Sequence, residues 1–188
     1  MKPTILLLAL LALVSCKEDS TAPSSSGTPP TAPDATTKLD DILLPTAPAT
    51  PVSITEARKD PTPGREVTLS GDIIGRADVF VPNRAMLILG DPDAITSCNR
   101  LHGDTCATPW DVCCDDPDVV KASIATIQVL DANGAPRKSG LKGLGGMKEL
   151  SQLVVQGTIA EGSGPDNLIV NASGIHIASV EANNTQKE

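Results

Sequence analysis

The residues LVVQGTI at 153–159 and LIVNASGIHI at 168–177 decide the fold of this chain. Apolar residues fill both stretches, and many are β-branched, which is typical of strands with a buried face. The connection at 161–167 contains two glycines and Pro165, which favour turns. We therefore predict that the two stretches form an antiparallel hairpin.

Three further strands are predicted upstream of this hairpin. Residues 66–74, 85–89 and 125–130 are short apolar or alternating runs, each bounded by glycine, proline or aspartate. A glycine-rich stretch at 140–146 then leads into residues 147–150, which we interpret as one or two helical turns. The predicted order is therefore three strands, a short helix and two strands, within a domain of residues 65–178 that suffices for one small core.

This order resembles the OB-fold, a small all-β, five-stranded Greek-key barrel. The resemblance is most specific in the hairpin, where Val-x-Gly-x-Ile at 155–159 precedes Leu-x-Val-x-Ala-x-x-Ile at 168–175. It implies a helix between the third and fourth strands that plugs one end of the barrel. Gly71 and Gly157, inside predicted strands, fit the tight bends of a small barrel. An open β-sandwich with the same strands is the alternative, and neither fold defines a function.

The N-terminus has the layout of a secretory signal peptide, predicted at residues 1–15. Lys2 precedes an apolar run at 5–14, which is too short to span a bilayer as a helix. Residues 13–16 resemble the bacterial lipobox, which implies cleavage before Cys16, acylation of its sulfur by palmitate-type chains and anchoring in a membrane. The residue after it is Lys17 rather than aspartate, which favours the outer over the inner membrane. The alternative is a plain signal peptide with a chance cysteine.

Residues 16–64 are predicted to be a disordered tether. They are rich in Pro, Thr, Ala and Ser, and such a segment cannot bury enough apolar surface to offset its ordering entropy. Its apolar residues Leu39, Ile42, Leu43 and Leu44 are interpreted as an isolated apolar spot in a flexible chain, with one helical turn as the alternative. Residues 179–188 are predicted to form a second disordered segment at the C-terminus.

Charge and composition narrow the classes of ligand. The formal net charge is −8, and Phe80 and Trp110 are the only aromatic residues. An acidic chain is poorly suited to neutralise phosphates, so nucleic acid is an unfavoured partner. Surfaces that bind sugars or single strands stack their ligands on aromatic rings, which are scarce here. Binding of oligosaccharide or nucleic acid by the OB-like face therefore stays a third alternative.

The chemistry of this sequence is concentrated in a cysteine-rich loop at 94–118. With Cys16 assigned to lipid, Cys98, Cys106, Cys113 and Cys114 remain, an even number in an oxidising compartment. Two structural disulfides are the first prediction. A bridge between the adjacent Cys113 and Cys114 strains the intervening peptide, so Cys98 and Cys106 are each expected to pair with one member of that pair.

A metal site is the alternative interpretation of the same loop. Cys98, His102, Cys106, Cys113 and Cys114 together offer the soft ligands that zinc or copper prefers. The loop lacks the Cys-x-x-Cys spacing of common zinc modules and of thiol–disulfide exchange enzymes. Its many aspartates also allow a calcium site, although their spacing does not match an EF-hand and Asp-Pro pairs commonly begin turns or cap helices.

No catalytic motif is recognisable in the sequence. It contains no nucleophile elbow, no Walker loop and no dinucleotide fingerprint. We therefore predict a non-catalytic binding or assembly module of the cell envelope, with no cofactor in this first interpretation. Trp110 is expected to pack over the cysteine loop, or else to contact an envelope protein partner. A lipoprotein that binds zinc or copper through the cysteine cluster is the alternative function.

Overall fold

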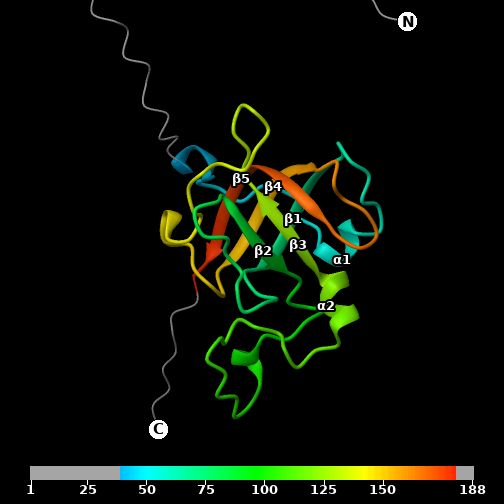
Figure 1. The fold of residues 1–188 in the computed structure, drawn as a ribbon, viewed down its shortest axis with the longest axis vertical. Helices are drawn as coiled ribbons and strands as arrows, with labels where there is room; N and C mark the ends of the chain where they lie inside the picture. The colour runs from blue at the N-terminus through cyan, green and yellow to red at the C-terminus, as the bar shows by residue number, and fades with distance from the viewer. Residues whose placement is uncertain (1–38, 181–188) are drawn as a thin grey trace, which may run out of the picture. The chain divides into compact units, whose positions relative to one another are not determined.

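A computed structural model describes residues 39–180 as a closed five-stranded β-barrel (Figure 1). The strands follow each other around the barrel in the order β1-β2-β3-β5-β4. Strands β1 and β4 pair antiparallel to close it, and β3 and β5 pair in parallel. The predicted all-β, OB-like fold is therefore confirmed. The strand bounds are β1 Glu66–Asp72, β2 Met86–Gly90, β3 Ile124–Gln128, β4 Gln152–Ile159 and β5 Ile169–Ser179.

Alternation of apolar residues along the strands builds the core of the barrel. In β1, Val67 and Leu69 are buried, and in β4, Leu153 and Val155 are fully buried. Successive side chains of a strand point to opposite faces, so these positions line the interior. No helix within residues 39–180 reaches the length and apolarity that a bilayer crossing demands.

Gly157 allows β4 and β5 to approach each other closely. The register between the two strands shifts between Gln156 and Gly157, as in a β-bulge. A Cβ placed on Gly157 would lie 2.3 Å from the backbone oxygen of Asn171, well inside van der Waals contact. This position of the barrel therefore requires a residue without a side chain.

The helix predicted at residues 147–150 is wrong. That segment forms a turn in which Leu150 has a φ of 66°, and the preceding 3-10 turn, η3 Leu144–Gly146, contains Gly145 at a φ of 57°. Left-handed backbone at several positions does not propagate an α-helix. Met147 is nevertheless fully buried in the core, so this connection fills the barrel with a side chain rather than with a helix.

The short helix of this barrel lies earlier in the chain, between β2 and β3. Helix α2 spans Pro117–Ser123. The carboxylate of Asp116 caps it by accepting hydrogen bonds from the backbone N–H groups of Asp118, at 2.8 Å, and Val119, at 3.4 Å. Proline at the first helical position has the backbone angle that a helix start needs. The Asp-Pro pair therefore caps a helix, as its chemistry predicts.

Residues 39–64, predicted as part of the tether, pack on the barrel instead. The 3-10 helix η1 Leu39–Ile42 and the single turn α1 Ile54–Ala57 both bury apolar side chains against the core. Val52 also forms backbone hydrogen bonds with Thr68 and Ser70 along β1, each 2.9 Å long. A few apolar residues at suitable positions thus order a segment whose overall composition indicates disorder. Residues 1–38, including the predicted signal peptide and Cys16, and residues 181–188 lie outside the described part.

The variant Ile54→Ala tests whether residues 39–64 pack on the barrel. Ile54 has no exposed surface, so its truncation is expected to lower the free energy of unfolding by about 2–5 kcal/mol. Chemical denaturation followed by circular dichroism measures the change. Val119→Ala, at an exposed position of α2, is the control and should change stability by less than about 0.5 kcal/mol. Equal stabilities of Ile54→Ala and the wild type would contradict the packing of this segment.

Candidate functional site

The cysteine loop, residues 91–116, connects β2 to α2 and extends beyond one end of the barrel (Figure 1). Its two arms are held side by side by backbone hydrogen bonds from Cys98 to Asp111, at 2.8 Å, and from Asn99 to Pro109, at 2.9 Å. The backbone N–H of Thr96 also donates to the carboxylate of Asp115 at 2.6 Å. The loop therefore has a defined shape that brings distant cysteines together.

A small second core fixes this loop on the barrel. Ile74, Ile95, Val112 and Ile124 form an apolar cluster, and Trp110 packs against both this cluster and the main core. The indole N–H of Trp110 donates to the backbone oxygen of Ala77 at 2.8 Å. Trp110 therefore packs against both apolar clusters, while its packing over the cysteines and its contact with a partner protein stay predictions.

An ion pair also joins the loop to the barrel. Arg100 lies 3.0 Å from the carboxylate of Asp72, a buried residue at the end of β1. The same guanidinium donates to the backbone oxygen of Pro92 at 3.3 Å. This contact was not predicted, because the two partners lie 28 residues apart and only the fold brings them together.

Three of the four cysteines in the loop meet at one point. The sulfur atoms of Cys98, Cys106 and Cys113 all lie within 4.8 Å of one another, and the sulfurs of Cys98 and Cys113 are 3.7 Å apart. This set of three residues is called the thiol triad below. Across the described residues it is the one group of three or more His, Cys, Asp or Glu side chains that is close enough to share an ion.

The two predicted disulfides are not formed in this structure. Cys98, Cys106, Cys113 and Cys114 are all free thiols. A sulfur separation of 3.7 Å is a non-bonded contact, since a disulfide bond is only ~2.05 Å long. The prediction also paired Cys98 and Cys106 with different partners, whereas the fold brings both of them to Cys113.

The spacing of the thiol triad suits a thiolate-bound metal ion. In a tetrahedral zinc site with Zn–S bonds of ~2.3 Å, neighbouring sulfurs are about 3.8 Å apart. The observed 3.7 Å between Cys98 and Cys113 agrees with that geometry. Cys98 is buried, Cys106 is half-buried and Cys113 is exposed, so the triad runs from the interior to the surface.

The thiols of the loop differ in acidity. Burial raises the pKa of Cys98 to about 12, and the neighbouring thiols of Cys113 and Cys106 add to this effect. The hydroxyl of Thr108, 3.4 Å from the Cys106 sulfur, lowers the pKa of Cys106. The adjacent thiol of Cys113 raises the pKa of Cys114. Cys98 is therefore protonated near neutral pH, and a metal ion that bound here would have to displace its proton.

Two other predicted metal ligands lie outside the triad. His102 is exposed on a turn of the loop, and Cys114 is exposed next to Cys113. Two of the aspartates considered for calcium bind the local backbone: Asp104 accepts a hydrogen bond from the N–H of Cys106, and Asp116 caps α2. This is the usual role of aspartate in turns and helix caps.

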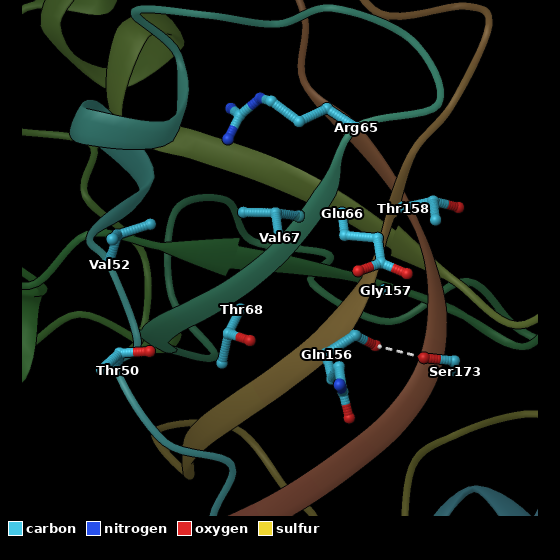
Figure 2. A pocket seen from close by; sticks show the side chains of 10 residues that line it. All are labelled: Thr50, Val52, Arg65, Glu66, Val67, Thr68, Gln156, Gly157, Thr158 and Ser173. Carbon is cyan, nitrogen blue, oxygen red and sulfur yellow. Dashed lines mark hydrogen bonds between the residues drawn. The ribbon is translucent and has the colours of Figure 1, made fainter.

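A separate polar hollow of about 310 Å³ lies on the β1–β4 side of the barrel (Figure 2). Ser173 donates to the backbone oxygen of Gln156 at 3.3 Å at one end of it. At the other end the guanidinium of Arg65 turns toward the backbone oxygens of Ala57 and Asp60. None of the residues that line this hollow is aromatic, so it offers no stacking platform for a sugar or a base.

None of the protein-family models, curated proteins and solved structures compared with this chain matches it. Function is therefore inferred from the chain's own residues. Among the clusters described above, the thiol triad is the one whose residue types and spacing specify a class of ligand.

Proposed function

We propose that this protein is a cell-envelope lipoprotein whose barrel is a non-catalytic module for binding a thiophilic metal ion, Zn²⁺ or Cu⁺. The observation that carries the proposal is the convergence of the sulfurs of Cys98, Cys106 and Cys113 within 4.8 Å. Thiolates select soft ions over Mg²⁺ and Ca²⁺. Cys114 or a water molecule completes a tetrahedral Zn²⁺ site, whereas three thiolates alone suffice for trigonal Cu⁺.

The electrostatics of the loop support a cation at this place. Asp104 lies close enough to the thiols to act on the pKa values of both Cys106 and Cys114. A bound cation would favour loss of the thiol protons, and the resulting thiolates together with this carboxylate would supply the negative charge that holds it. A bound ion also ties the two arms of the loop together, so it performs the stapling that the sequence assigns to disulfides.

The proposed location depends on the N-terminus. Lys2, the apolar run at 5–14 and Cys16 have the order of a lipoprotein signal, so we propose a lipid anchor on Cys16, in the outer rather than the inner membrane. Acyl chains hold such a protein at a membrane because each buried methylene contributes ~0.8 kcal/mol. In this arrangement the barrel presents the metal loop at the membrane surface.

Intact-mass analysis tests both parts of the proposal on protein purified from the envelope without chelators. Under native conditions we expect one Zn²⁺ or Cu⁺ per chain, and under denaturing conditions the mass of a chain that begins at acylated Cys16. Alkylation is expected to modify the three thiols of the triad only after a chelator has removed the ion, whereas the exposed Cys114 is protected only if it is the fourth ligand. A metal-free native mass with two disulfides would refute the metal site, and an uncleaved, unacylated chain would refute the anchor.

A further inference from the structure

A second cavity, of about 340 Å³, is lined by positively charged side chains. It lies where the chain after α1, the helix α2, strand β3 and the β4–β5 connection meet. No cysteine of the thiol triad lines it. Arg58, Arg76 and Lys121 line it, together with a single acidic residue, Asp166. Three cations around one cavity are unexpected in a chain with a net charge of −8.

Arg58 is held in a fixed orientation. Its Nε and Nη2 donate to the backbone oxygen of Ile124 at 3.3 and 2.9 Å, and its Nη1 donates to that of Pro165 at 3.2 Å. A guanidinium carries five N–H donors, so one N–H remains on each terminal nitrogen. No carboxylate in the described part of the chain forms a salt bridge with Arg58. Its charge is therefore positioned but not neutralised by contact.

The other charged side chains leave the cavity positive. Arg76 is exposed, and no hydrogen bond or ion pair of its side chain occurs within residues 39–180. Lys121 pairs with Asp166 at 2.6 Å, so these two charges largely cancel. Two guanidinium groups that form no salt bridge within residues 39–180 thus remain at one cavity, and Asp166 acts on Arg58 only at longer range. Guanidinium binds phosphate and carboxylate oxygens through paired hydrogen bonds.

The rest of the lining limits the kind of anion that fits. Ile124 and Leu168 are buried and Ile88 is half-buried, so part of the wall is apolar. The volume is that of a pocket for a small molecule rather than a groove for a polymer. The excess of two positive charges matches a phosphate monoester, which carries about −1.5 to −2 near neutral pH.

We propose that this cavity binds a small phosphate monoester with an apolar body, whose phosphate lies between Arg58 and Arg76. The apolar part contacts Ile88, Ile124 and Leu168. A phosphate monoester of this kind occurs both in free metabolites and in lipid headgroups, and in both cases the cavity would bind the phosphate and the adjoining apolar group. This inference does not depend on the metal site.

Calorimetric titration of the full chain with phenyl phosphate tests this site. We expect saturable binding that is tighter than that of inorganic phosphate, which lacks the apolar body, and of benzoate, which lacks the second charge. Arg76→Gln is expected to weaken phenyl phosphate binding about tenfold, the effect of losing one charge-assisted contact. It is the cleanest variant, because Arg76 has no structural contact to lose. Arg58→Gln should also weaken binding but removes contacts with Ile124 and Pro165.

Arg84→Gln is the matched control, since Arg84 is an exposed arginine away from this cavity and should leave the affinity unchanged. Titration of Cys98→Ser should give the same result, because Cys98 lines neither this cavity nor the neighbouring hollow that Arg76 shares with Cys113. Failure of the metal site and failure of this site are therefore distinguishable. Vesicles containing phosphatidic acid assign the source: capture by the wild type but not by Arg76→Gln indicates a headgroup, and binding of the soluble ester alone indicates a metabolite. Equal affinities of the wild type and Arg76→Gln, or tighter binding of a single-stranded oligonucleotide than of phenyl phosphate, would overturn the proposal.

Discussion

Cys98→Ser is expected to weaken the binding of Zn²⁺ by on the order of 100-fold or more. Losing a residue that only supports a metal ligand lowers affinity 10–100-fold, and losing a ligand should reach or exceed the upper end of that range. Cys98 is the buried member of the thiol triad, 3.7 Å from Cys113, so no exposed residue replaces it from the same side. Competition with a chromophoric chelator at neutral pH measures the affinity.

Cys114→Ser is the matched control for this prediction. Cys114 is an exposed thiol of the same loop but lies outside the triad, so its loss should affect Cu⁺ binding little and Zn²⁺ binding less than the loss of Cys98. Circular dichroism of both variants shows whether the barrel stays folded. If the two serine variants bind Zn²⁺ as tightly as the wild type, the triad is not the metal site.

Gly157→Ala is expected to lower the free energy of unfolding by about 3 kcal/mol or more, at or above the upper end of ordinary overpacking. Its Cβ would lie 2.3 Å from the backbone oxygen of Asn171, so β5 must move away from β4. Strands β4 and β5 are paired along most of their length, so their separation opens the barrel. Denaturant unfolding followed by far-ultraviolet circular dichroism measures the loss.

The control for this variant is Gly140→Ala. A Cβ at Gly140 would have only the backbone nitrogen of Asn83 nearby, at 4.0 Å, and its φ is not in the left-handed region. Its stability should therefore equal or slightly exceed that of the wild type. A Gly157→Ala protein as stable as Gly140→Ala would show that β5 does not cross Gly157 as closely as described.

The strands were predictable because their signal is local. Alternation at Val67 and Leu69, and the apolar run around Val155, follow from the pleat of a single strand. The helix predicted at 147–150, between the third and fourth strands, does not form, because the glycines within 143–146 and Leu150 have left-handed backbone. Helix α2 has a local signal, Asp116-Pro117, but this pair occurs equally in turns and so does not by itself predict the helix that follows.

The docking of residues 39–64 was not predictable from composition. Proline, threonine and alanine dominate this segment, but Leu39, Ile42 and Ile54 enter the core one at a time. Each gains burial only from side chains that belong to distant strands, so neither helical nor strand periodicity reveals it. The cationic cavity was not predicted for the same reason, because Arg58 lines it only when residues 39–64 pack on the barrel.

The sequence predicted the loop that contains the cysteines but not how the cysteines are arranged within it. The four cysteines within 17 residues indicated a cluster, whereas their mutual positions depend on contacts such as that between Cys98 and Asp111. The same contacts place Cys113 in the triad and leave His102 outside it. Disulfides and metal thiolates use the same residues, and only the sulfur separations distinguish them.

The gradient of burial across the triad has a kinetic consequence for an ion held there. Cys98 is buried and Cys113 is exposed, so an ion bound at the proposed site would be accessible to solvent from the Cys113 side. A thiolate or imidazole from a second molecule could then bind such an ion before a sulfur of the triad departs, so exchange would proceed by associative substitution. The proposed centre is therefore suited to handing its cargo to an acceptor, in contrast to enclosed structural zinc sites, which leave no position open.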